Sequence, residues 1–127
     1  MSKMRRLRLV SCESGATAVE FALVAPPFLM LFVGILSACV AVLTEASLDY
    51  AVEGAARCYS VNSTQCSTAS ATQSYAQTLY QGPNSPAPTF TASTPSCGHQ
   101  VTGTLNYVLS AGVKQWTIPM SSTACFP

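Results

Sequence analysis

The chain has 127 residues, of which 49% are hydrophobic and only 9% are charged. A soluble domain carries about 25% charged residues, so this composition indicates a small protein that is attached to a membrane or exported. The net charge of +1 argues against nucleic-acid binding, which requires a sizeable basic surface. The single histidine, His99, is expected in a turn or on the surface, and no residue pattern predicts an enzyme, a metal site, a cofactor or a small-molecule substrate.

A basic leader occupies residues 1–15, and an apolar run follows it. The cations of the leader are Lys3, Arg5, Arg6 and Arg8. Residues 21–44 carry no charge, and as a helix they reach about 36 Å, enough to cross a hydrocarbon core of about 30 Å. Because cations precede this run and acids follow it, the positive-inside rule predicts a cytoplasmic N-terminus and places residues 45–127 outside. The alternative, a cleaved signal peptide, has a shorter apolar region of about 7–15 residues.

Two consecutive prolines, Pro26 and Pro27, stand inside the apolar run. Each proline removes a backbone donor, and its ring clashes with the preceding turn. We therefore expect a kink in the membrane helix at this place.

An acid, Glu20, stands at the junction between the leader and the apolar run. The junction reads GATAVEF over residues 15–21. A cut between Gly15 and Ala16 removes the leader and makes Glu20 the fifth residue of the mature chain, directly followed by the aromatic Phe21.

This junction resembles the processing site of type IV prepilins. The stretch GATAVEFALVAPPFLMLFVGI, with AVEGAAR at residues 51–57, resembles the TadE-like pseudopilins of tight-adherence (Flp-type) pilus systems. The resemblance implies a structural component of pilus assembly that a prepilin peptidase cleaves between Gly15 and Ala16. It implies that Glu20 and Phe21 pair with a neighbouring subunit, with the Glu20 carboxylate neutralising the neighbour's new amino terminus. It also implies other pilus and pseudopilin subunits as partners, and a place in the bacterial inner membrane or in the pilus.

Two alternatives stay open at this point. Residues 36–39, Leu-Ser-Ala-Cys, fit the lipobox of a lipoprotein, in which case Cys39 carries lipid and anchors an envelope or adhesive protein. The other alternative is a single-pass membrane protein that keeps its basic leader and has no role in a pilus.

The membrane helix is expected to continue beyond the apolar run. Four charged residues recur every fourth position and share one helix face: Glu45, Asp49, Glu53 and Arg57. The sequence therefore predicts one transmembrane and juxtamembrane helix over residues 16–57, ending near Ala56, with this face in solvent.

Four cysteines follow the predicted helix: Cys58, Cys66, Cys97 and Cys125. An even number of cysteines in a small exported domain indicates a disulfide framework. Three pairings are open. We favour Cys58 with Cys66, which flank a turn-like segment, and Cys97 with Cys125, which flank a β-like segment.

The tail, residues 58–127, predicts a small Ser/Thr/Pro-rich extracytoplasmic domain. Residues 67–81 have helical spacing, with Ser67 or Thr68 as the N-cap, and residues 83–96 hold four prolines and predict an irregular connection. Residues 101–109 alternate as a half-buried strand, and residues 116–120 predict a return strand with Pro119 at an edge. The fold class is therefore α+β: a long transmembrane helix followed by a disulfide-stapled domain with a short helix and a β-hairpin.

Overall fold

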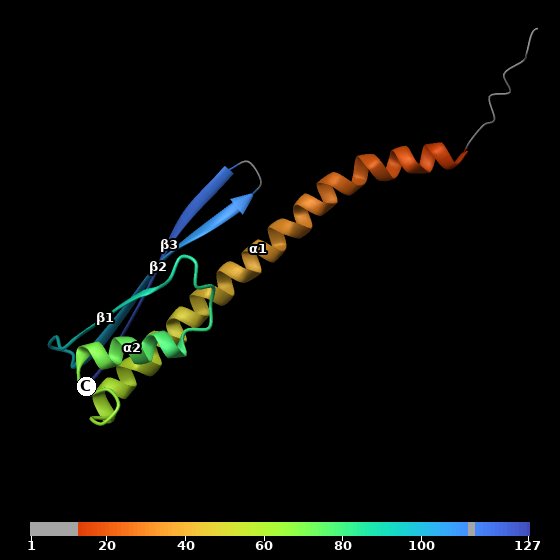
Figure 1. Ribbon diagram of the computed structural model, residues 1–127. Coiled ribbons are helices and arrows are strands. Elements are labelled where there is room, and N and C mark those ends of the chain that lie inside the picture. Colours follow the sequence, from red (N-terminus) through yellow and green to blue (C-terminus); the bar gives the residue numbers. More distant parts are fainter. Residues whose placement is uncertain (1–12, 112–113) are drawn as a thin grey trace, which may run out of the picture. The chain divides into compact units, whose positions relative to one another are not determined.

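The structure, a computed structural model, describes residues 13–111 and 114–127 (Figure 1). Its elements are the helices α1 (Glu13–Val61) and α2 (Ala69–Leu79) and the strands β1 (Thr89–Ser93), β2 (His99–Ala111) and β3 (Lys114–Phe126). The predicted leader lies outside the described residues as far as residue 12. The chain divides after Ile35 into two compact units, which are described separately below.

The described part of the first unit is the beginning of α1. The helix starts at Glu13, three residues before the predicted start, and its assignment runs unbroken through Pro26 and Pro27. From Gly15 onward almost every side chain of this unit is exposed, including large apolar ones such as Phe28 and Leu31. The expected kink at the prolines stays a prediction.

Within the second unit, the burial of α1 changes abruptly at Thr44. Thr44 is fully buried, and its hydroxyl donates a hydrogen bond to the carbonyl oxygen of Val40 at 2.7 Å. The buried residues that follow on α1 are mostly small: Leu48, Ala51, Val52, Ala55 and Ala56. Small side chains allow neighbouring elements to approach the helix axis closely, so this half of α1 forms the centre of the domain.

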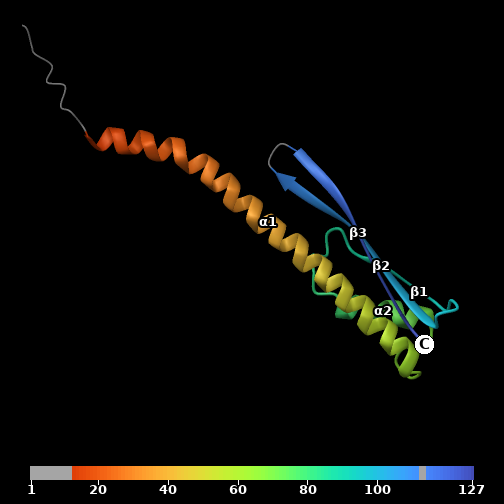
Figure 2. The same cartoon turned by 180° about the vertical axis from the view of Figure 1, so that it is seen from behind.

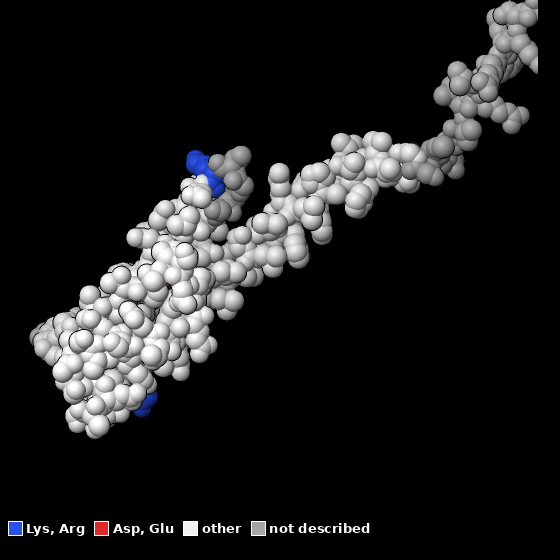
Figure 3. Space-filling view, in the orientation of Figure 1, with Lys and Arg blue, Asp and Glu red and all other residues white. Residues whose placement is uncertain are grey.

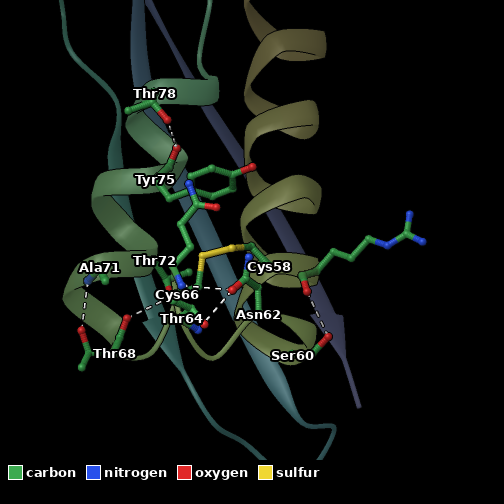
Figure 4. Close-up of a disulfide and its surroundings, with 12 residues drawn as sticks. Cys58, Ser60, Asn62, Thr64, Cys66, Thr68, Ala71, Thr72, Tyr75 and Thr78 are labelled. Atoms are coloured by element: carbon green, nitrogen blue, oxygen red, sulfur yellow. Dashed lines mark hydrogen bonds between the residues drawn. A yellow bond between two sulfur atoms is a disulfide. The ribbon is translucent and has the colours of Figure 1, made fainter.

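The end of α1 differs from the prediction, because the helix continues past Ala56 to Val61. The amide of Asn62 donates to the carbonyl oxygen of Cys58 at 2.8 Å, which extends the helical hydrogen bonding, and Cys58 forms a disulfide with Cys66. The Asn62 side-chain oxygen then accepts bonds from the amides of Thr64 and Gln65 at 3.1 and 3.0 Å (Figure 4). This local capping and the disulfide reverse the chain direction immediately after the helix.

Helix α2 begins with the predicted cap. The Thr68 hydroxyl accepts a hydrogen bond from the amide of Ala71 at 3.2 Å. The helix ends at Leu79, before the predicted end at Gln81, because Tyr80 takes an extended conformation. Burial raises the pKa of the Tyr80 hydroxyl, which donates to the carbonyl oxygen of Pro83.

Two contacts attach the end of α2 to α1. The Gln81 amide donates to the Ser47 hydroxyl oxygen at 2.8 Å. A Cβ added at Gly54 would lie 2.7 Å from Cδ1 of Leu79. The absence of a side chain at Gly54 therefore lets the two helices approach each other.

The sheet has three antiparallel strands in the order β1-β2-β3, whereas the sequence predicted two. The additional strand, β1, lies in the proline-rich segment that was predicted to be irregular, and it pairs Thr89 with Thr104 through Ser93 with Gln100. The alternation from Thr89 to Ser93 explains the strand, since Phe90 is buried while its neighbours Thr89 and Thr91 are exposed.

The β2–β3 hairpin is longer than predicted. Its register runs from His99 opposite Phe126 to Ala111 opposite Lys114. His99 is thus the half-buried first residue of a strand and not a turn residue. Pro119 lies on β3, which is an edge strand as expected, because β3 pairs only with β2 in this sheet.

The two faces of the sheet differ in composition. Phe90, Val101 and Leu105 belong to the buried cluster that contains the Ala-rich half of α1, and the views in Figures 1 and 2 place both helices beside this sheet. The opposite face is rich in threonine. There the hydroxyls of Thr102 and Thr123 lie 3.1 Å apart in a hydrogen bond. One face therefore packs against the helices, and the other presents hydroxyl groups.

The second disulfide closes the sheet at the end near the C-terminus. It joins Cys97, just before β2, to Cys125 in β3. Between Cys97 and β2, Gly98 has a φ of +120°, a value that residues with a Cβ rarely adopt, and its amide donates to the carbonyl oxygen of Pro95. Both disulfides are the pairs that the sequence favoured.

A test of the packing against α1 is the variant Gly103→Ala. A Cβ at Gly103 would lie 2.7 Å from Val52 and 2.9 Å from both Leu48 and Phe90. Overpacking of this kind costs about 1–3 kcal/mol, so we expect this loss in the free energy of unfolding, measured by chemical denaturation of the full chain in detergent. In the control Gly34→Ala the added Cβ has no atom within 4 Å, so this variant should show no such loss, and the better helix propensity of Ala favours a small gain. Equal stability of both variants would contradict the described packing.

A second test compares the two disulfides. The chain-entropy expression gives about 3.6 kcal/mol for the Cys97–Cys125 loop and about 2.6 kcal/mol for the Cys58–Cys66 loop, whose sequence separations are 28 and 8. We therefore expect paired Cys→Ser substitution of the longer loop to lower the denaturation midpoint more. Cys39→Ser, which removes an exposed free thiol, is the matched control and should have no effect. The reverse order of the two losses would disagree with this account.

Candidate functional site

The predicted processing site lies at the start of α1. Gly15 and Ala16 are exposed and stand in the first turn of the helix. A Cβ placed on Gly15 would have no atom within 4 Å. The first amides of a helix have no intrahelical acceptor, so this turn is held by fewer hydrogen bonds than the helix interior.

Glu20 and Phe21 follow on the same helix, and both are exposed. Glu20 lies four residues after Ala16 and therefore on the same helix face. Among the described residues, no ion pair involves the Glu20 carboxylate. A carboxylate that stands at the edge of a large apolar surface requires water or a cation from outside the described chain.

The apolar surface of α1 is continuous from Phe21 to Leu43. Its exposed large side chains include Leu23, Met30, Phe32, Ile35 and Val42. Of the helices in the described ranges, one, Gly15–Val61, is long and apolar enough to cross a membrane, judged by length and composition. On the face seen in Figure 3, no charged side chain interrupts the apolar part of this helix. An exposed apolar surface of this extent needs lipid or other apolar helices around it.

The four charged residues that the sequence placed on one helix face form an exposed stripe on α1, called the acidic stripe below because three of the four are acids. They are Glu45, Asp49, Glu53 and Arg57. Asp49 and Glu53 also line a shallow groove whose other wall is the end of β3, residues 122–126. In the ranges 13–111 and 114–127, no group of three or more His, Cys, Asp or Glu side chains is placed to hold a metal ion.

His99 contributes to packing. Its ring meets the ring of Tyr59 edge-on, with the centroids 4.4 Å apart, and connects the end of α1 to the sheet. Its buried Nδ1 has no hydrogen-bond partner among the residues that the structure describes. Cys39, the residue on which the lipoprotein alternative depends, is an exposed free thiol inside α1.

Comparison with known proteins finds a family match for most of α1. Residues 15–57 match the family model of TadE-like proteins. This segment is TadE-like. The match confirms the resemblance expected from the sequence, covers about a third of the chain, and begins at Gly15, the residue of the predicted cut. No curated protein matches the chain. No solved structure matches it.

The TadE-like segment includes the whole apolar surface and the acidic stripe, and it ends at Arg57, before the first disulfide. With the single candidate membrane helix among the described residues, it supports a membrane protein associated with a Tad pilus. The sequence had not indicated one feature of the C-terminal domain, the apolar far end of the β2–β3 hairpin, because its side chains alternate with polar residues.

Proposed function

We propose that this protein is a minor pseudopilin, a structural component in the assembly of a tight-adherence (Flp-type) pilus. The observation that carries the proposal is the TadE-like match that starts at Gly15, at the junction between the basic leader and the exposed apolar helix. The partners are other pilus and pseudopilin subunits and a prepilin peptidase.

The proposed topology has three parts. Residues 1–15 are a leader in the cytoplasm, residues 16–57 are the transmembrane and juxtamembrane helix, and residues 58–127 lie outside the inner membrane. Two disulfides within the last part favour an oxidising compartment. Cations before the apolar run favour the same orientation.

The proposed role of Glu20 follows from charge pairing. Cleavage after Gly15 creates a positive amine at Ala16, close to hydrocarbon. A charge in low dielectric is tolerated mainly when it is paired, and the exposed Glu20 carboxylate of a neighbouring subunit neutralises this amine. Cleavage also brings Glu20 close to the N-terminus of the shortened helix, where the helix dipole favours an anion.

The lipoprotein alternative receives less support. Processing at Cys39 removes residues 1–38, which include the first half of the TadE-like segment. The mature chain then keeps little of the exposed apolar surface of α1. A single-pass protein without a pilus role keeps this surface but gives no reason for a match that begins at Gly15.

Processing is tested by intact mass. In cells that co-express a prepilin peptidase, we expect a 112-residue form that begins at Ala16. Gly15→Leu should block the cut, because a large side chain does not fit where the peptidase requires a small residue, while Gly15→Ala should be cut. The full-length chain in cells with active peptidase would overturn the proposal, and an 89-residue lipidated form would favour the lipoprotein.

Assembly is tested with Glu20→Ala. This chain should still be cut, but removing one partner of a desolvated pair costs about 3–5 kcal/mol, so we expect incorporation to fall by more than about 100-fold. Incorporation is measured by crosslinking of the chain to other pilus subunits in membranes. Glu45→Ala, which removes an exposed acid beyond the apolar run, is the control and should assemble normally. Normal assembly of Glu20→Ala would refute the pairing.

A further inference from the structure

The β2–β3 hairpin continues well beyond the buried core of the exported domain. The buried residues of β2 end at Leu105, which is only 4% exposed. Beyond it, the same face of the hairpin holds two cross-strand pairs, Tyr107 with Ile118 and Leu109 with Trp116. Trp116 is 45% exposed and Ile118 is 38% exposed, whereas Tyr107 and Leu109 are half-buried, so the β3 side of this apolar face is uncovered.

The hairpin extends along α1 toward the apolar run. His99 contacts Tyr59, and Gly103 lies against Leu48 and Val52, so β2 runs antiparallel to α1. Leu109 follows Gly103 by six residues, which is about 20 Å of strand and corresponds to about 13 helix residues. Both ribbon views show the hairpin continuing in this direction beyond α2 (Figures 1 and 2). The hairpin end therefore reaches the level of residues 36–39 of α1, within the same compact unit.

The burial of α1 limits where the outer membrane surface lies. Thr44 is fully buried by the exported domain, so lipid does not surround the helix there. Val40, Val42 and Leu43 are exposed and apolar. A span of about 20 residues from Phe21 ends near residue 40. The membrane surface thus falls at the level that the hairpin end reaches.

We propose that the end of the hairpin rests in the outer interface of the lipid bilayer as a second membrane contact beside α1. Tyr and Trp are enriched at this interface, and here Tyr107 and Trp116 are placed among apolar neighbours. Val40, Val42 and Leu43 of α1, in the same unit as the hairpin, are also exposed and apolar, so lipid around them reaches the hairpin end.

The charge at the hairpin end also favours contact with lipid. Lys114 is the single charged residue of residues 58–127, and its Nζ lies 5.6 Å from the centroid of the Trp116 ring. Figure 3 shows the corresponding basic atoms at the end of the hairpin. A cation beside an interfacial tryptophan suits the phosphates of anionic lipids, and the hairpin has no acid to oppose it.

Trp116 makes the test direct, because it is the only tryptophan of the chain. The full chain is reconstituted in vesicles of phosphatidylethanolamine and phosphatidylglycerol, with and without bromine on the acyl chains. We expect the fluorescence emission of Trp116 to be blue-shifted relative to tryptophan in water. Brominated lipid should quench this emission, and iodide in the aqueous phase should not. The matched control is Trp116→Phe combined with Val61→Trp, which moves the tryptophan to the other end of the domain, where Val61 is 75% exposed. Iodide should quench the emission of this control, and brominated lipid should not.

Two results would overturn the proposal. One is emission from Trp116 that responds to iodide and to brominated lipid as the control does. The other is protection from iodide without loss in brominated lipid, which would place a second copy of the chain over the hairpin. The charge is tested with Lys114→Glu in two kinds of brominated vesicle, with and without phosphatidylglycerol. The substitution should reduce the quenching of Trp116 only where phosphatidylglycerol is present. An equal effect of the substitution in both kinds of vesicle would remove the role given to Lys114.

The measurement is independent of the pilus role. It requires only that α1 inserts in the vesicle, so its failure leaves the pseudopilin proposal standing. Failure of cleavage at Gly15 leaves the hairpin result interpretable in the same way.

Discussion

The packing of a small-residue face of α1 against the sheet and α2 is the interaction on which the C-terminal domain depends. Ala51, Ala55 and Ala56 have no exposed surface, and Gly103 has no side chain between the sheet and the helix. Because the same helix is apolar and uncovered before residue 44, one continuous element provides both the candidate membrane anchor and the centre of the domain. The domain therefore has no core of its own that is separate from α1.

The disulfides act where this core ends. A domain of about 70 residues buries too little apolar surface to be stable by packing alone. Cys58–Cys66 fixes the turn that follows α1, and Cys97–Cys125 joins two strands at the far end of the sheet.

Features with a strong local cause were predictable from the sequence. The charge-free run, the Thr68 cap and the alternation of β2 each follow from residues that are close in the chain. Strand β1 was not predictable, because four prolines in residues 83–96 indicate irregular backbone and the partner strand supplies the ordering hydrogen bonds. The later end of α1 depends on Asn62 and a disulfide. That the apolar end of the hairpin lies outside the core was not predictable, because only the structure shows that the buried residues of β2 end at Leu105.

The threonine-rich face of the sheet has a consequence for how the domain responds to the solution around it. Its water contacts come from hydroxyl groups such as those of Thr102 and Thr123, which carry no charge and do not titrate between acid and alkaline conditions. Salt screens interactions between exposed charges, and these hydroxyls carry no charge to be screened. The net charge of this face therefore stays the same when the acidity of the surroundings changes.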